Sequence, residues 1–162
     1  MIAKQWFVLQ SKPQKENVVC SQLARLEGKV ECFFPRIRSH LGIKPLFPSY
    51  LFVSFLPDSE HFRLIKYTRG TLRILGSRGG EPLPVTNEIV ATVKNKLGPD
   101  GLIDQRGVYP IGKVVKVRRG PLKDLIGILE KPTSEVGRVQ VLFRLLRYPL
   151  RAALKFEDLE AA

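Results

Sequence analysis

The sequence predicts an α+β fold, in which a sheet with packed helices is followed by a small all-β unit. Strand and helix patterns alternate over residues 1–97, and this order favours an antiparallel or mixed sheet with helices against it. From residue 110 onward, short apolar runs are separated by turn residues, which is typical of a small barrel. Residues 98–109 contain three glycines and one proline and predict a linker between the two units.

Four strands are expected in the first unit, at residues 5–9, 30–35, 45–55 and 71–75. The third strand is unusual because both of its faces are apolar. Its side chains alternate between one face with Tyr50, Phe52 and Ser54 and another with Leu51, Val53 and Phe55. Such a strand is either buried on both sides or keeps one aromatic face bare for a partner.

Three helices are expected to complete the first unit. The first would begin with Ser11 as its N-cap, with Gln14 forming a capping box, and would end at Gly28. Ser59 is expected to cap a short second helix. The third would end at Gly98 and is marked by apolar residues at helical spacing, namely Ile89, Val93 and Leu97.

Residues 110–162 allow two interpretations. Short β-type runs predict a barrel and lie at residues 113–117, 125–129, 138–143 and 152–156. Gly120, Pro121 and Gly127 also disfavour helix. However, the last thirty residues are rich in helix-favouring side chains, including leucines at helical spacing: Leu142, Leu145 and Leu146. The barrel is the favoured prediction, and an α-helical hairpin is the alternative.

The charge of the chain predicts a polyanionic partner. There are 27 basic and 15 acidic residues, which gives a net charge of +12. This excess favours nucleic acid, because basic side chains release the counterions of the phosphate backbone. The excess is dense over residues 36–73, where only Asp58 and Glu60 oppose seven cations. Residues 36–44 of this stretch are expected to form a basic connector between strands.

The sequence carries no constellation typical of an enzyme or of a resident cofactor. Cys20 and Cys32 lack Cys or His partners at zinc-ligand spacing and are expected to be reduced packing residues. His40 and His61 are not associated with a nucleophile motif, and no phosphate-binding loop occurs. The start does not resemble a signal peptide and no apolar run is long enough for a bilayer, so a cytoplasmic protein is expected.

Six motifs, taken in order, resemble one family. They are "WFVL" (6–9), "ECFFP" (31–35), "PLFPSYLFV" (45–53), "YTRGTLRILG" (67–76), "GEPLP" (80–84) and "VVKVRRGPLKDLIGIL" (114–129). Each motif is weak alone, but the combination resembles the NusG family of bacterial transcription elongation factors, most closely its specialised RfaH-like branch. The resemblance extends from residue 6 to residue 159.

The resemblance implies an NGN domain over residues 1–97, with a four-stranded antiparallel sheet flanked by helices. It also implies a KOW domain, an SH3-like barrel, over residues 110–162. It implies a monomer that binds RNA polymerase at the clamp helices and gate loop, suppresses pausing, and in some members contacts non-template DNA. The KOW domain would recruit a small-subunit ribosomal protein or Rho. In RfaH itself this domain first forms an α-helical hairpin that masks the polymerase site. The rival interpretation is a ribosome-associated or general RNA-binding KOW protein, which would not need a bare aromatic strand.

The family's motifs also assign roles to residues of this chain. The polymerase contact would comprise Phe47, Tyr50, Phe52, His61, Phe62 and Arg63. Within that set, His61-Phe62-Arg63 stands where the RfaH-like branch has His-Thr-Thr, so Phe62 has a core position as its alternative and His61 a solvated one. The DNA contact would comprise Lys12, Gln22, Arg36, Arg38, Arg69 and Arg73. Leu122 and Leu125 are the exposed apolar candidates for contact with the partner of the KOW domain, and a core position is the alternative for one of them.

Overall fold

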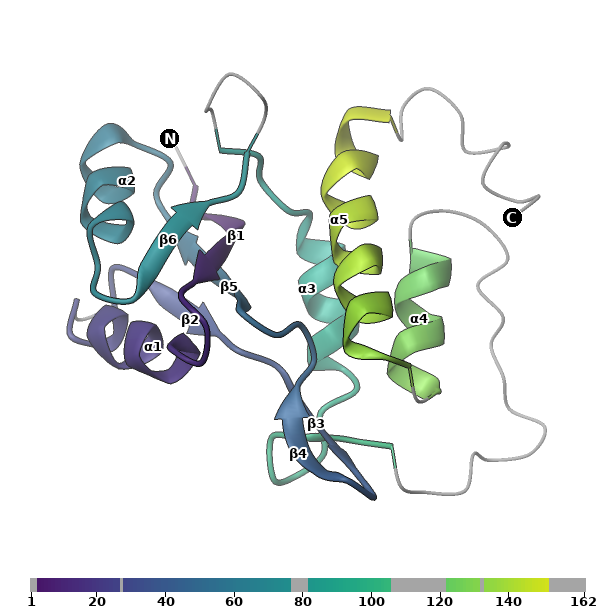
Figure 1. Ribbon diagram of the computed structural model, residues 1–162. Coiled ribbons are helices and arrows are strands. Elements are labelled where there is room, and N and C mark those ends of the chain that lie inside the picture. The colour runs from purple at the N-terminus through teal and green to yellow at the C-terminus, as the bar shows by residue number, and fades with distance from the viewer. Residues whose placement is uncertain (1–2, 27, 77–81, 106–121, 132, 152–162) are drawn as a thin grey trace.

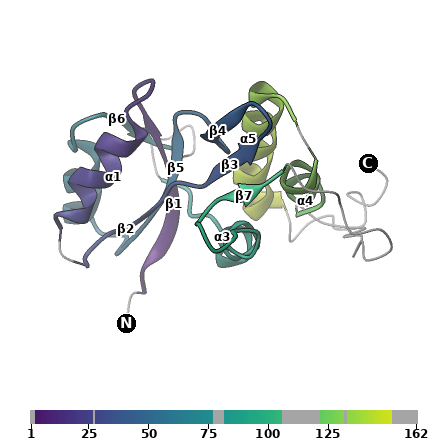
Figure 2. The same cartoon turned by 90° about the horizontal axis from the view of Figure 1, so that it is seen from below.

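A central four-stranded sheet separates two layers of helices in the computed structural model of the chain, which describes residues 3–26, 28–76, 82–105, 122–131 and 133–151 (Figure 1). Helices α1 (Glu16–Ala24) and α2 (Ser59–Lys66) cover one face of the sheet. The other face carries α3 (Asn87–Lys94), α4 (Leu122–Glu130) and α5 (Glu135–Arg151), and the view from below shows the same division (Figure 2). Within the described ranges, no helix is both long and apolar enough to cross a bilayer.

The sheet is antiparallel throughout, which confirms the predicted α+β class of the N-terminal part. Its strand order is β2-β5-β1-β6, with β5 (Tyr50–Phe55) and β1 (Gln5–Ser11) in the centre and β2 (Glu31–Phe33) and β6 (Thr71–Ile74) at the edges. In the central pair Val8 lies opposite Phe52. Apolar side chains on both faces of β1 and β5 suit these central positions, where both faces of a strand are covered.

Strand alternation divides the buried side chains into two cores. The α1/α2 core consists of Phe7, Leu9, Val19, Leu23, Val30, Leu51, Val53, Phe55 and Ile65. The α3–α5 core lies on the opposite face and includes Trp6, Val8, Phe47, Tyr50 and Phe52 together with apolar side chains of α3, α4 and α5. Both faces of β5 are therefore buried, and its residues divide between the two cores as the alternation predicted.

Residues 36–44, expected to be a connector, form most of a β-hairpin instead. Its strands β3 (Arg36–Ser39) and β4 (Gly42–Pro45) are antiparallel, and Gly42 supplies the positive φ of 109° that the tight turn requires. The short strand β7 (Ile103–Asp104) pairs in parallel with β3, and Leu102 and Ile103 are buried. The first half of the predicted linker therefore packs against the hairpin.

Two predicted helix caps are wrong. Ser11 is the last residue of β1, where its N–H donates to the Ser49 carbonyl at 2.8 Å, and α1 begins only at Glu16. Helix α2 is capped by Asp58, whose carboxylate accepts the His61 N–H at 2.9 Å. Ser11 is occupied by pairing in the sheet, and α1 begins after Lys15 with no side-chain cap. At α2 the Asp58 carboxylate takes the capping role, which aspartate fills well.

The favoured barrel prediction is wrong for the described C-terminal residues, which form two helices in contact with each other. The runs at 125–129 and 138–143, predicted as strands, lie in α4 and α5; those at 113–117 and 152–156 lie outside the described residues. Gly127 costs about 1 kcal/mol in a helix interior, whereas each fully buried leucine or isoleucine contributes about 1.5–3 kcal/mol. Burial of the apolar faces of both helices against the sheet therefore outweighs the local preference.

Candidate functional site

The aromatic segment around Phe47, Tyr50 and Phe52 is the main candidate site. A turn that links Phe47 to Tyr50 precedes β5, with the Tyr50 N–H donating to the Phe47 carbonyl at 3.0 Å. Ser49 adopts a positive φ of 71° within this turn, and its N–H donates to the buried Glu16 carboxylate at 3.0 Å. These contacts fix the direction of three aromatic side chains before any partner is present.

The three aromatic side chains lie on one face and contact one another or the C-terminal helices. The Phe52 ring lies 6.0 Å from both the Phe33 and the Phe47 ring centroids. Tyr50 is only 8% exposed, and its ring meets Phe143 of α5 edge-on at 5.4 Å. Burial raises the pKa of the Tyr50 hydroxyl, while the positive charge of Arg73 opposes that shift.

The helical hairpin of α4 and α5 covers this aromatic face. Buried side chains of both helices belong to the same core as Phe47, Tyr50 and Phe52, namely Leu125, Ile128, Leu129, Val141, Leu142, Leu145 and Leu146. The two helices stand beside α3 on the side of the sheet away from α1 (Figure 2). The aromatic segment is therefore masked by residues that follow it by more than seventy positions.

Arg138 adds a polar connection between α5 and the aromatic segment. This side chain is 4% exposed, and its Nε donates to the Leu46 carbonyl at 2.7 Å. Its two terminal nitrogens donate to the carbonyls of Pro45 and Thr133. Burial lowers the pKa of Arg138, and the Glu135 carboxylate partly offsets this effect. The sequence analysis did not identify Arg138 as a site residue. The feature that could have indicated it is a single arginine within the otherwise largely apolar run 138–143.

The remaining residues of the expected polymerase contact lie on α2, across the sheet from Tyr50. Phe62 packs edge-on against Phe7 and Phe55, with ring centroids 5.4 and 5.2 Å apart, so the core alternative describes its place. The His61 Nδ1 lies 2.7 Å from Asp58 Oδ1, and Arg63 is exposed. Hydrogen bonds from the backbone and then the ring of His61 lower the pKa of Asp58. The structure does not bring these residues together with the aromatic segment.

The expected DNA-contacting residues occupy separate places. Lys12 and Arg69 are exposed and close along the surface, because the Lys12 N–H donates to the Gly70 carbonyl at 2.8 Å. Arg73 donates from Nε to the Gln10 side chain at 2.9 Å. Gln22 is half-buried on α1.

The two other arginines of that set lie on the β3–β4 hairpin. Arg36 is exposed there, and Arg38 forms an ion pair with Asp100 at 2.6 Å. Within the described residues, a backbone hydrogen bond brings two of the expected DNA-contacting residues close together. It runs from Lys12 to Gly70, the residue next to Arg69.

Leu122 and Leu125 are not exposed in this conformation, contrary to expectation. Leu125 is fully buried in the α3–α5 core and Leu122 packs against its edge. Both face inward because α4 presents its apolar side to the sheet. Cys20 and Cys32 carry free thiols and pack against the α1/α2 core, as expected. In the described part of the chain, no three His, Cys, Asp or Glu side chains gather as they would around a metal ion.

Comparisons with known proteins agree with this architecture. The chain is similar to transcription termination/antitermination proteins NusG, with 26% identity to that of Buchnera aphidicola subsp. Baizongia pistaciae over 85% of each chain. It is 24% identical to the NusG of Vibrio vulnificus, covering 97% of this chain and 95% of that one. A solved structure, described as domain interaction in Thermotoga maritima NusG, matches 74% of this chain and 75% of its own with a TM-score of 0.50 at 18% identity, which supports the fold.

The family described as transcription termination factor nusG matches residues 4–94, more than half of the chain. This match covers the sheet, α1, α2 and α3, and includes the aromatic segment. The chain therefore belongs to the NusG family of transcription termination/antitermination factors, which are not enzymes.

Proposed function

We propose that this protein is a specialised, RfaH-like elongation and antitermination factor whose polymerase-binding face is masked by its own C-terminal helices. The observation that carries the proposal is the burial of Phe47, Tyr50 and Phe52 under α4 and α5. Aromatic side chains are typical anchors of protein interfaces, and an apolar face of this size needs a cover when its partner is absent. The clamp helices of RNA polymerase would replace α4 and α5 on this face.

Masking would set the apparent affinity for polymerase. A partner that binds only the open form has its affinity reduced by the fraction of molecules that are open. The hairpin is held by apolar side chains and by Arg138, whose hydrogen bonds to Leu46 and Pro45 must break on opening. Recruitment would therefore need a signal that favours the open form.

The proposed organisation retains the boundaries expected from the sequence. Residues 1–97 would form the NGN domain, 98–109 the joining segment and 110–162 the KOW domain. Once released, the KOW domain would adopt the barrel that its turn residues favour, and Leu122 and Leu125 would then face a ribosomal protein or Rho. Lys12 and Arg69 would contact non-template DNA, and His61 and Arg63 would approach the gate loop.

Binding of core RNA polymerase by full-length variants tests the proposal. Leu142→Asp and Leu145→Asp place charges in the core beneath α5, and we expect them to release the hairpin and raise the apparent affinity at least about tenfold, given an open fraction below about 10%. Val136→Asp is the matched control, because this residue of α5 is 68% exposed. Its affinity should equal that of the unmodified chain.

The aromatic segment is tested in the opened background. Adding Tyr50→Ala and Phe52→Ala to Leu145→Asp should abolish the gain in polymerase binding, while far-ultraviolet circular dichroism verifies that the sheet still forms. Absence of polymerase binding by both the unmodified and the opened chain would refute the proposed function. Equal binding by the opened chain with and without the aromatic substitutions would refute the assignment of the site.

A further inference from the structure

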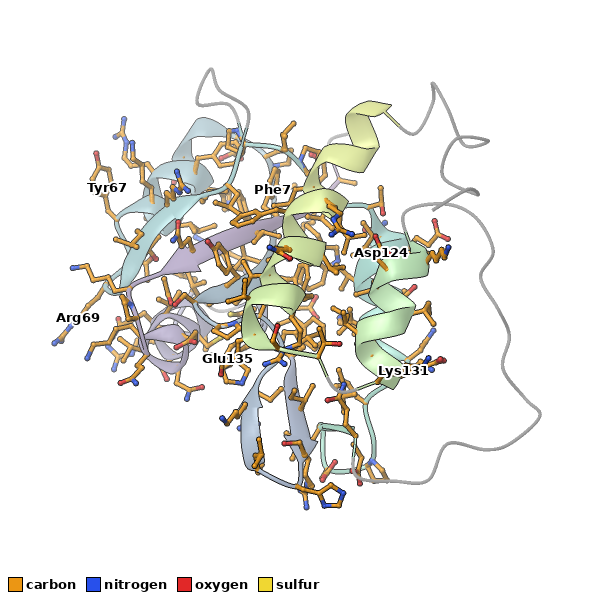
Figure 3. The ribbon with its side chains drawn as sticks, turned by 45° about the vertical axis from the view of Figure 1, so that its right-hand side comes forward. Phe7, Tyr67, Arg69, Asp124, Lys131 and Glu135 are labelled. Carbon is orange, nitrogen blue, oxygen red and sulfur yellow. The ribbon has the colours of Figure 1, made fainter. Side chains whose placement is uncertain are left out.

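An exposed tyrosine lies on the side of the molecule away from the helical hairpin. Tyr67 follows the last turn of α2 and is 75% exposed, and Leu64, one turn earlier, is also exposed. Tyr67 and Arg69 project from the same side of the molecule, away from α4 and α5 (Figure 3). An aromatic ring this exposed contributes little to the core and is accessible to a ligand.

Hydrogen bonds hold the turn that carries Tyr67. The Tyr67 N–H donates to the Arg63 carbonyl at 3.1 Å, and the Thr68 hydroxyl donates to the Leu64 carbonyl at 2.8 Å. The Thr71 N–H closes the turn on the Thr68 carbonyl at 3.0 Å. The backbone beneath the ring is therefore ordered in advance, and a ligand on the ring would order only the side chain.

The turn that carries this ring is basic. The Lys66 Nζ lies 5.9 Å from the centroid of the Tyr67 ring, and Arg69 is exposed two residues later. Gly70 packs so closely on the start of α1 that a Cβ there would lie 3.4 Å from the Lys15 Cβ. Its carbonyl also accepts the Lys12 N–H. Lys66 therefore lies beside the ring, and the exposed Lys12 and Arg69 adjoin the same turn through Gly70.

Among the described residues, the carboxylates within α1 and α2 are distant from Tyr67 or engaged elsewhere. Glu60 is seven residues before Tyr67 on α2, which corresponds to about 10 Å along a helix axis. The carboxylate of Glu16 is buried and accepts the Ser49 N–H. The field around Tyr67 is thus positive, which selects an anionic ligand that also has a planar apolar part.

We infer that Tyr67 stacks on an unpaired base of single-stranded nucleic acid while Lys12, Lys66 and Arg69 bind the adjacent phosphates. A single strand presents both a π-face and a phosphate within one nucleotide, whereas a duplex hides its base faces in the stack. The inference rests on the proposed function, in which the factor contacts non-template DNA, and it adds Tyr67 as the residue that holds a base. Its ring would favour any unstacked base, and the cations would supply the salt-dependent part of the affinity.

Fluorescence anisotropy with a single-stranded oligodeoxynucleotide of about 12 residues tests this inference on the full chain. Tyr67→Ala should weaken binding roughly 5- to 150-fold, the range for loss of one base stacked on an aromatic side chain. Tyr67→Phe should bind like the unmodified chain, and Tyr67→Leu should lose most of the affinity because it keeps apolar area without a ring face. Leu41→Ala, an exposed change on the β3–β4 hairpin, is the control and should have no effect.

Salt dependence distinguishes stacking from charge. Arg69→Ala should reduce the slope of log affinity against log salt by about 0.7, the value for one phosphate contact in a single strand, whereas Tyr67→Ala should leave the slope unchanged. A 2-aminopurine base in the oligonucleotide should lose fluorescence on binding to the unmodified chain and retain it with Tyr67→Ala. Unchanged affinity and unchanged quenching in Tyr67→Ala would overturn the inference.

The polymerase assay separates this inference from the proposed function. Tyr67→Ala in the Leu145→Asp background should bind polymerase as tightly as Leu145→Asp alone, since Tyr67 lies across the sheet from Tyr50. Loss of oligonucleotide binding with polymerase binding retained supports the inference. If the Leu145→Asp chain binds polymerase but neither it nor the unmodified chain binds single strands, the inference fails and the proposed function stands.

Discussion

The two faces of the central sheet are both buried, but they are covered in different ways. The α1/α2 core is closed by helices that lie next to their strands in the chain, as α1 follows β1 after four residues. The opposite face is closed partly by α3 and partly by α4 and α5, which come after residue 121. The first face is thus closed by the N-terminal part itself, and the second has a cover whose last two helices take no part in the strand pairing of the sheet.

The side chains reflect this difference. On the α1/α2 side, Phe7, Phe55 and Phe62 pack against one another within the N-terminal part. On the other side, Tyr50 finds its aromatic neighbour, Phe143, on a C-terminal helix. A partner with an apolar helical surface would supply equivalent contacts to Tyr50, whereas nothing external can replace the contacts of Phe7.

The largest effect is expected from Phe7→Ala. The Phe7 ring stacks on Phe55 at 4.8 Å and is buried, so its removal should lower the free energy of unfolding by about 3–5 kcal/mol. Urea denaturation followed by tryptophan fluorescence measures this change, because Trp6 lies in the adjacent position of β1. Leu142→Ala in α5 is the comparison on the other face, because this side chain is also 1% exposed, and it should perturb the sheet much less. Equal loss from both variants would remove the distinction between the two faces.

An intermediate effect is expected from Arg138→Met, which removes hydrogen bonds without removing apolar volume. The carbonyls of Leu46 and Pro45 lose their side-chain donor. The bond to Leu46 is the buried one, and its loss costs about 1–3 kcal/mol. Hydrogen exchange should accelerate in α4 and α5 while β1 and β5 stay protected. Arg144→Ala breaks only an exposed ion pair with Asp124 and serves as the control. Uniform acceleration through the sheet would show that the cover is not separable.

The smallest effect is a pH dependence at the start of α2. The pKa of Asp58 is lowered in the folded chain by the backbone N–H and then the ring of His61. Because the pKa of Asp58 is lower in the folded than in the unfolded chain, its ionised carboxylate stabilises the fold at pH values above the ordinary carboxyl pKa near 3.9. This contribution disappears as the pH falls through the pKa of the folded chain. The stability difference between the unmodified chain and Asp58→Ala should therefore be constant near neutral pH and shrink below about pH 4. A difference that persists unchanged in acid would contradict the assignment of the cap.

Much of the N-terminal part could be predicted from local pattern. Strand alternation correctly divided Tyr50 and Phe52 from Leu51 and Val53, because the period of a strand is set by its backbone. The caps at Ser11 and Ser59 failed because each choice depended on a competing group, the strand partner in one case and the carboxylate of Asp58 in the other. Local sequence does not reveal such competition.

The sequence predicted the aromatic residues of the candidate site, but it did not predict that α4 and α5 would cover them. Phe47, Tyr50 and Phe52 stand out because three aromatic side chains in six residues exceed what a two-sided strand needs for its own core. Arg138 was not foreseen, since its partners are backbone carbonyls more than ninety positions away. Tyr67 was overlooked because only the folded chain shows that it is exposed beside cations.

The sequence alone determined the antiparallel sheet, the division of β5 between two faces and the membership of the NusG family, because these depend on residue types at short, regular spacing. The tertiary structure decided the state of residues 122–131 and 133–151. Their leucines, isoleucines and valines suit either a strand or a helix, and Gly127 argued for the strand. The apolar face of Phe47, Tyr50 and Phe52 needed a cover, and two helices that bury their leucine-rich sides on it satisfy both surfaces at once.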